Sequence, residues 1–210
     1  MTDENENENE FEEKINIMTL GNTTVGKTCF ILKFTENRFQ ETYIATIGLD
    51  FKMKTIQIKE KKYKIFFYDT TGQERYVSIA FNTIKNADGI FLMYDITNEQ
   101  SFQSLPEWIN SVREAKGNDF PIILLGNKID KEEERKITKE AGKELADKYE
   151  FGFFEISNKE GINIEKAGLA LIKKILDKKK DDDPDYTISN TIRLNNTKIS
   201  EKAGIHKKCC

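Results

Sequence analysis

Hydrophobic positions along the middle of the chain follow two periodicities, which predict strands alternating with helices. Two continuous apolar runs, 89–95 and 121–127, suit parallel strands that are covered on both faces. Residues 51–59 mostly alternate and are followed by a second apolar segment after only three residues, which predicts an antiparallel hairpin. The six predicted strands are residues 14–20, 51–59, 63–69, 89–95, 121–127 and 152–157.

The segments between these strands have helical spacing, and four helices are predicted at 29–36, 101–115, 137–149 and 162–176. Ser101 is expected to cap the second, with Pro106 delaying its first firm turn, and Thr138 to cap the third. The last carries one apolar stripe, formed by Ile164, Gly168, Leu171 and Ile175. This alternation predicts an α/β fold: a doubly wound, mostly parallel six-stranded sheet with one antiparallel hairpin. Ligands of such sheets bind at the carboxyl ends of the strands.

Charge divides the 210 residues into a compact middle and two tails. Residues 1–13 carry seven acids and no base, so we expect a disordered acidic tail there, a domain at 14–178 and a flexible tail at 179–210. A net charge of −3 argues against nucleic-acid binding by bulk electrostatics. The absence of an apolar run of 18 residues excludes a membrane-spanning helix, and a single histidine, His206, disfavours His-dependent metal or triad chemistry.

The first motif is a phosphate loop. Residues 21–28, GNTTVGKT, fit the pattern GxxxxGK[ST] between a predicted strand and a predicted helix. Backbone N–H groups of such a loop and the following helix N-terminus converge on a β-phosphate. Lys27 reaches the β- and γ-phosphate oxygens, and the Thr28 hydroxyl binds Mg²⁺. A simple glycine turn is the alternative, which the strand-loop-helix context disfavours.

A second motif selects the base. Asn127-Lys128-Ile129-Asp130 follows the apolar stretch at 121–126. A carboxylate at Asp130 can accept hydrogen bonds from N1–H and N2–H₂ of guanine, whereas adenine offers no donor there and would leave it unpaired. Residues 157–159, Ser-Asn-Lys, follow the last strand, where a third loop would contact the base. The sequence therefore favours GTP or GDP over ATP.

A third motif, Asp69-Thr70-Thr71-Gly72-Gln73, ends the second hairpin strand. Asp69 can hold Mg²⁺ through water, and Gly72 lets a backbone N–H approach the γ-phosphate. Gln73 both donates and accepts, so it can orient an attacking water and is the candidate catalytic residue. Thr46 offers a second hydroxyl to Mg²⁺.

Together these motifs resemble the Ras-superfamily small GTPases, and IGLDF (47–51), ERY (74–76), MYDIT (93–97) and the terminal cysteine pair resemble the Rab family within it. The resemblance implies the P-loop GTPase fold, GTP hydrolysis to GDP and regulation of vesicle trafficking. It implies that Phe39 packs on the guanine, Tyr43 covers the γ-phosphate and the Asn158 N–H meets the guanine carbonyl. The implied nucleotide contacts are Gly21, Thr23, Thr24, Val25, Gly26, Lys27, Thr28, Cys29, Phe39, Tyr43, Thr46, Gly72, Asn127, Lys128, Asp130, Ser157, Asn158 and Lys159; the implied Mg²⁺ ligands are Thr28, Thr46 and Asp69.

The resemblance also implies partners. The loops around 37–47 and 70–80 would be switches that γ-phosphate contacts order. The partners implied are an exchange factor, an activating protein, an escort or GDP-dissociation-inhibitor carrier, and effectors that bind the switches. The protein itself would be a monomer. Cys209 and Cys210 are not a CaaX box, yet paired thiols suit a double lipid anchor, by likeness two geranylgeranyl groups. The protein would cycle between the cytosol and the cytosolic face of an intracellular membrane. An unmodified or disulfide-linked tail is the alternative, and Cys29 is expected to be a buried apolar residue.

Three threonines depart from the family pattern. Thr23 and Thr24 replace small residues in a loop whose backbone is often tight or of positive φ, which β-branched side chains resist. The resemblance implies that Thr23 and Thr71 lie beside the γ-phosphate, where their bulk can displace the attacking water or block an arginine finger. We therefore predict slow intrinsic hydrolysis and a weak response to an activating protein. The Thr71 hydroxyl as a phosphoryl acceptor is less favoured than a spectator role. Tyr68 stands where many Rab proteins have Trp.

Two other functions stay open: a GTP-binding scaffold that barely hydrolyses, supported by these threonines and opposed by Gln73, and a Ras-like signalling GTPase, opposed by IGLDF and the paired cysteines. A nucleoside kinase would leave NKID and the switch motifs unexplained.

Overall fold

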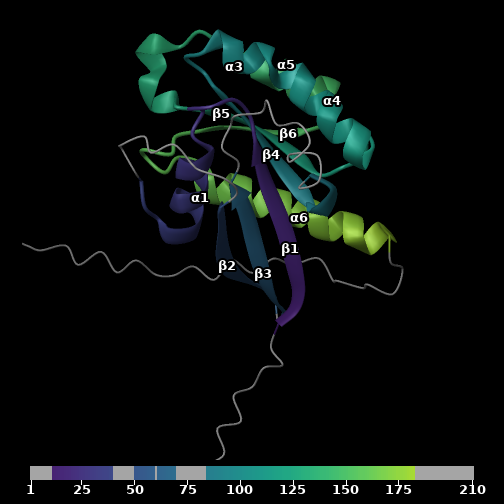
Figure 1. Cartoon of the computed structure of the whole chain (residues 1–210). Coiled ribbons are helices and arrows are strands. Elements are labelled where there is room, and N and C mark those ends of the chain that lie inside the picture. Colours follow the sequence, from purple (N-terminus) through teal and green to yellow (C-terminus); the bar gives the residue numbers. More distant parts are fainter. Residues whose placement is uncertain (1–10, 40–49, 60, 70–83, 183–210) are drawn as a thin grey trace, which may run out of the picture.

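The computed structural model describes residues 11–39, 50–59, 61–69 and 84–182, and the structural statements below concern these residues. They form one six-stranded sheet with helices on both faces (Figure 1). The strands are β1 (Phe11–Leu20), β2 (Asp50–Ile58), β3 (Lys61–Asp69), β4 (Gly89–Asp95), β5 (Ile122–Asn127) and β6 (Gly152–Ile156). The helices are α1 (Lys27–Glu36), α3 (Glu99–Gln103), α4 (Leu105–Lys116), α5 (Lys139–Lys148) and α6 (Ile164–Asp182), with a 3₁₀ helix, η1, at Ile129–Glu134.

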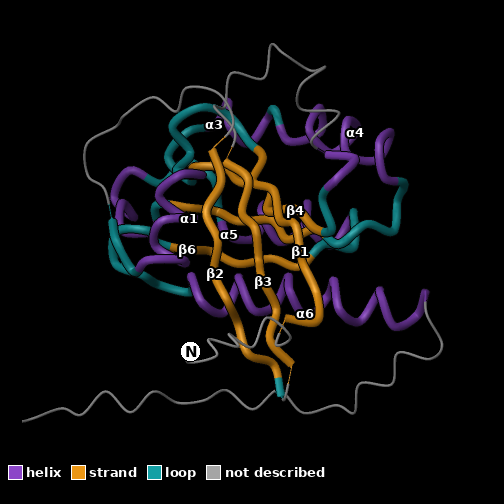
Figure 2. The backbone as a smooth tube through the Cα atoms, turned by 60° about the horizontal axis from the view of Figure 1, so that its bottom comes forward, coloured by secondary structure: helices purple, strands orange, loops and turns teal. Residues whose placement is uncertain are grey.

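The strand order is β2-β3-β1-β4-β5-β6. β2 and β3 are antiparallel, and every other neighbouring pair is parallel. This confirms the predicted mixed sheet with one hairpin, whose strands β2 and β3 extend beyond α6 in Figure 2. Because the five strands β1 and β3–β6 run the same way, their carboxyl ends meet along one edge, which we call the carboxyl edge. The opposite edge is called the amino edge.

Each face of the sheet has its own hydrophobic core. On one face α1 and α6 pack around a cluster that includes Phe34, Phe67 and Leu171. On the other, α4 and α5 pack around Trp108 and Tyr94. The predicted stripe of the last helix is confirmed, since Ile164, Leu171 and Ile175 are at most 4% exposed and the ring of Phe34 lies against Gly168.

Three boundaries differ from the sequence expectation. β1 begins at Phe11 and pairs with the first residues of β3, so residues 11–13 are strand rather than tail. α6 continues to Asp182 because the lysine-rich stretch after 176 keeps helical propensity. The helix predicted at 101–115 is two helices: Asn98, not Ser101, caps α3, and the chain breaks at Ser104 with Pro106 in the first turn of α4. Among the described residues, no helix has the length and hydropathy to cross a membrane.

Candidate functional site

Buried polar side chains gather at the carboxyl edge. Asp69, Asp95 and Asn127 are the last residues of β3, β4 and β5 and are each at most 5% exposed. Ser157 and Asn158 directly follow β6, and Lys27 begins α1, which follows β1. Burial of polar groups costs free energy unless they bond to each other or to a ligand. The edge therefore has the features of a binding site.

The loop between β1 and α1 needs its two glycines. Gly21 has φ 132°, and a Cβ there would lie 2.1 Å from the carbonyl oxygen of Met93. Gly26 has φ 101° and is the N-cap of α1, and a Cβ there would lie 2.4 Å from Nδ2 of Asn127. A side chain at either position would therefore collide with a neighbouring group, and both backbone conformations favour glycine.

Thr24 has a φ of 63°, in the left-handed region. A β-branched residue there is strained by about 1–3 kcal/mol. The expectation of a positive-φ backbone in this loop is confirmed at Thr24, whereas Thr23 keeps a negative φ. Both side chains are exposed.

Lys27 and Thr28 start α1 under this loop. The Lys27 ammonium donates to the carbonyl oxygens of Gly21 (2.5 Å) and Asn22 (2.8 Å). The Thr28 hydroxyl donates to Oδ2 of Asp69, the last residue of β3, at 2.6 Å. A hydroxyl beside a carboxylate is the hard oxygen set that Mg²⁺ prefers, and a buried lysine at a helix N-terminus suits phosphates, so the residues present fit both groups.

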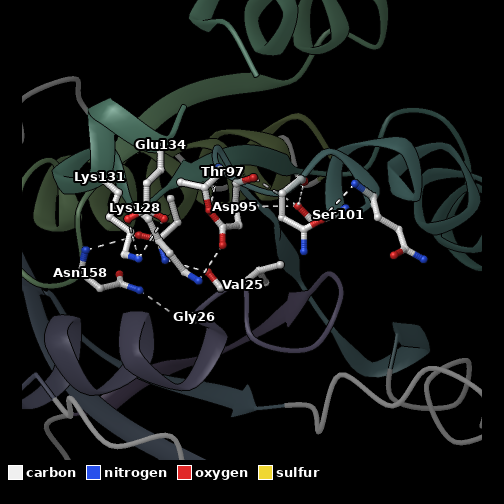
Figure 3. Close-up of polar contacts among 12 residues, drawn as sticks. Val25, Gly26, Asp95, Thr97, Ser101, Lys128, Lys131, Glu134 and Asn158 are labelled. Atoms are coloured by element: carbon white, nitrogen blue, oxygen red, sulfur yellow. Dashed lines mark hydrogen bonds and ion pairs between the residues drawn. The ribbon is translucent and has the colours of Figure 1, made fainter. Parts of the chain in front are cut away.

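Two amides from other strand ends bind the loop (Figure 3). Asn127 Nδ2 donates to the carbonyl oxygen of Val25 at 2.7 Å, and Asn158 Nδ2 donates to that of Gly26 at 2.9 Å. The Asn158 N–H also donates to Oδ1 of Asn127, at 3.4 Å. Segments about 100 and 130 residues away in sequence therefore fix the two loop carbonyls immediately before Lys27.

The two base-loop candidates also contact each other. The Ser157 hydroxyl donates to Oδ1 of Asp130 at 2.6 Å, which orients the carboxylate that was predicted to read guanine. Lys128, at φ 73°, places its ammonium 2.6 Å from Oδ2 of Asp95. Oδ1 of Asp95 accepts from the backbone and hydroxyl of Thr97, so the residues around this carboxylate are held in place.

Arg135 fastens the end of η1 to β6. Its guanidinium donates to Glu155 at 2.6 Å and to Glu132 at 2.8 Å. Hydrogen bonds to these two carboxylates raise the pKa of Arg135. The hydrogen bond from Arg135 lowers the pKa of Glu132. Burial raises the pKa of the Tyr94 hydroxyl, and the negative charge of Glu155 raises it further. The segment that carries Asp130 is thereby fixed to the sheet.

The remaining predicted residues are less enclosed or lie elsewhere. Lys159 is exposed and Phe39 is 39% exposed. Cys29 is half-buried, so the expectation of a buried core residue is wrong, since this position of α1 lies at the side of the core stripe. Predicted residues outside the described residues are Tyr43, Thr46, Thr71, Gly72, Gln73, Cys209 and Cys210.

Two contacts of the site were not predicted. Asp95 ends an apolar strand, and that position alone, a carboxylate at a strand end, could have indicated its pairing with Lys128. Asn22 accepts from the Trp108 indole N–H at 3.1 Å and donates to the Ser104 hydroxyl at 3.1 Å, which joins the phosphate loop to α4. No local pattern indicates the second contact, because its partners are more than 80 residues apart.

Comparison with known proteins decides the family. The model of the Ras family matches residues 16–177. The chain is similar to Ras-related protein Rab-10 of Diplobatis ommata, with 40% identity over 92% of this chain and 94% of the relative. It is also similar to Rab-3B of Bos taurus, with 37% identity over 95% and 91% of the two chains. The chain belongs to the Ras family and, within it, to the Rab proteins.

As a Rab protein, the chain is a GTPase switch that binds GTP and GDP, hydrolyses GTP and regulates vesicle trafficking. Rab proteins associate with intracellular membranes and in general work with exchange factors, activating proteins, GDP-dissociation inhibitors and effectors. The Rab motifs IGLDF, ERY and MYDIT in the sequence agree with this membership.

Proposed function

We propose that this Rab protein holds the nucleotide along the carboxyl edge, with the phosphates on the loop at 21–28 and the guanine beside Asp130. One observation carries the proposal: the side chains of Asn127 and Asn158 bond directly to the phosphate loop, so base-side and phosphate-side residues form one contiguous site. Lys27 binds phosphate oxygens and Asp130, oriented by Ser157, accepts from the guanine edge.

Thr28 and Asp69, with Thr46, hold Mg²⁺. The ion supplies neutralisation of negative charge on the phosphates. The described residues contain no group of three acidic, histidine or cysteine side chains that could hold a metal unaided. One carboxylate and hydroxyls bind Mg²⁺ well only together with phosphate oxygens. Binding of the ion therefore depends on the nucleotide.

Gln73 orients the attacking water by donating and accepting at once. Thr23 is exposed on the phosphate loop, and Thr71 directly precedes Gly72 in the sequence. These two threonines add bulk beside the γ-phosphate. Intrinsic hydrolysis is therefore slow and the response to an activating protein weak. The hydrolysis-poor scaffold is the limiting case of the same argument.

Phosphate release from protein loaded with GTP and Mg²⁺ in a single turnover tests these roles. The expected result is slow release that Gln73→Leu abolishes and that a Thr23→Gly/Thr71→Ala double variant accelerates. Release that is equal in wild-type protein and in Gln73→Leu contradicts the role of Gln73 and favours the scaffold. If the double threonine variant releases phosphate no faster than wild type, the bulk of these threonines does not explain slow hydrolysis. Intact mass after the incubation tests the phosphoryl-acceptor alternative, which requires an adduct that Thr71→Ala lacks.

The remaining proposals concern surfaces. Phe51 and Met53 on β2 are 58% and 51% exposed, and Phe51 contacts Phe66 of the neighbouring strand, with ring centroids 6.3 Å apart. Adjacent exposed apolar residues support an effector-binding face on the hairpin, where Tyr68 replaces Trp.

Geranylgeranyl groups on Cys209 and Cys210 anchor the GTP form to the cytosolic face of an intracellular membrane.

Intact mass of the protein isolated from eukaryotic cells tests the anchor. Two geranylgeranyl additions are expected, and the double variant Cys209→Ser/Cys210→Ser should lack both and leave the membrane fraction. A Cys29→Ser variant is the matched control, because it removes a thiol of α1 and keeps the tail. Unmodified mass in the wild-type protein contradicts the proposal.

A further inference from the structure

The side chain of Asn158 makes a contact that the motif at 157–159 does not require. Asn158 was expected to use its backbone N–H toward guanine, yet its side chain reaches the phosphate loop and donates to the carbonyl oxygen of Gly26 (Figure 3). The residue is 4% exposed. Because a carbonyl can only accept, the amide nitrogen must be the atom that faces Gly26.

The contact fixes a peptide unit of the phosphate cradle. In a trans peptide the C=O and the following N–H point in opposite directions. Asn127 holds the Val25 carbonyl, which orients the Gly26 N–H, and Asn158 holds the Gly26 carbonyl, which orients the Lys27 N–H. The Gly26 carbonyl also accepts from Phe30 N–H at 2.9 Å in the first turn of α1. Asn158 therefore adds a donor from outside the helix to this carbonyl.

The geometry of Gly26 makes this extra donor consequential. With φ 101° and no side chain, Gly26 has more backbone freedom than other residues. A substituent on its α-carbon would meet both amides, at 2.4 Å from Asn127 and 2.8 Å from Asn158. The two amides thus enclose Gly26 and limit the movement of its peptide units.

Oδ1 of Asn158 is buried and has no hydrogen-bond partner among the described residues. The only side-chain hydrogen bond of Asn158 among the described residues is therefore the one from its amide nitrogen to Gly26.

We propose that Asn158 is a positioning residue that couples base and phosphate binding: its side chain holds the Gly26–Lys27 peptide so that its N–H faces the phosphates, and this slows nucleotide release. The proposal rests on the nucleotide orientation given under Proposed function. It adds a second amide to the one that Asn127 of the NKID motif provides.

Release of a fluorescent GDP analogue from the full chain, chased with excess GDP in Mg²⁺ buffer, tests the proposal. Asn158→Ala should release the analogue about tenfold faster, as expected for one buried hydrogen bond. Asn158→Asp, which keeps the shape and replaces the donor by an acceptor facing the Gly26 carbonyl, should release it at least as fast. Asn16→Ala is the matched control, because it removes an amide donated to the Asn86 carbonyl (3.3 Å) away from the site, and should stay within about twofold of wild type.

Backbone amide resonances of the GDP-bound protein provide the second readout. Asn158→Ala should shift the Lys27 N–H resonance, and Asn16→Ala should not. Unchanged release, or shifts confined to residues 157–159, would overturn the inference, because Asn158 would then shape only the base loop. Failure of the wild-type chain to retain the GDP analogue would instead contradict the nucleotide site itself. If the wild-type chain retains the GDP analogue and the Asn158 variants release it at the wild-type rate, only the role of Asn158 is contradicted.

Discussion

The two edges of the sheet are built on opposite principles. At the carboxyl edge, buried side chains form short bonds to half-buried partners: Asp69 accepts from Thr28, and Ser157 donates to Asp130. At the amino edge polar side chains stay partly exposed: Lys179 forms ion pairs with Glu13 at 2.6 Å and with Asp88 at 3.6 Å, and all three remain 24–30% exposed. Full burial of polar groups costs more free energy than partial exposure. The fold thus concentrates its costly polar contacts at the edge where we propose that the nucleotide binds.

This difference separates the consequences of substitution. Changes at the carboxyl edge should alter nucleotide binding strongly, whereas changes at the amino edge and between the helices should alter the free energy of unfolding alone.

Lys27→Ala should have the largest effect. It removes the buried ammonium that bonds to Gly21 and Asn22 and that we propose to bind the phosphates. With each charge-assisted hydrogen bond contributing about 1.5–3 kcal/mol, the dissociation constant of GDP should rise at least about 100-fold. Calorimetric titration measures it. A rise of less than threefold would mean that the phosphates bind elsewhere.

Asp130→Ala should come next, and it should change selectivity. The dissociation constant of GDP should rise by about 100-fold while that of ADP changes little, since only guanine donates to this carboxylate. Competition against a fluorescent nucleotide measures both. Ser157→Ala, which removes only the bond that orients Asp130, should lose about tenfold for GDP. Equal losses for both nucleotides would argue against base recognition by Asp130.

Gly168→Ala should act on stability instead. A Cβ there would lie 2.1 Å from the Phe34 ring, between α6 and α1. Overpacking of this kind costs about 1–3 kcal/mol, so the melting temperature of the GDP-bound protein should fall by roughly 2–12 °C. Lys166→Ala, an exposed residue of the same helix, is the control. An unchanged melting temperature would show that α6 moves away from α1 without cost.

Thr24→Gly should stabilise the protein. Glycine adopts a φ of 63° without the strain that threonine carries, and this gain exceeds the extra entropy of the unfolded chain. The expected gain is about 1 kcal/mol, seen as a rise in melting temperature of roughly 2–4 °C. Thr23→Gly, at a position of negative φ, should give no gain. Stabilisation by both variants alike would exclude backbone strain as the cause.

Lys179→Ala should have the smallest effect. Its ion pairs are partly exposed, so they contribute at most about 1 kcal/mol to the free energy of unfolding, less at high salt. Urea unfolding of the GDP-bound protein at two salt concentrations measures this, with GDP affinity as the internal reference. Altered GDP affinity would contradict the separation of the two edges.

Sequence reasoning predicted elements that are fixed by local signals. Strand type followed from apolar runs, and the cap at Thr138 is confirmed by the bond from Ala141 N–H to its hydroxyl. It missed the break at Ser104, because Pro106 fits the first turn of a new helix as well as a delayed old one. It also missed the cap at Asn98, which lies before the apolar pattern begins.

The site was predictable as a set of motifs and not as a network. Each motif states which groups meet the ligand, whereas the bonds between motifs depend on the strand order β1-β4-β5-β6. Asn158 illustrates this, since its side-chain partner is Gly26, 132 residues away. The burial of Cys29 was misjudged for a related reason, because the side of α1 that faces the sheet is set by packing and not by hydropathy alone.

Trp108 is the single tryptophan of the chain, and its indole N–H bonds to Asn22 of the phosphate loop while the ring is 8% exposed. Indole emission depends on hydrogen bonding and on contact with water. The protein therefore carries an intrinsic optical reporter at its phosphate loop, so that loading and release of nucleotide can be followed with unlabelled protein and unmodified GTP.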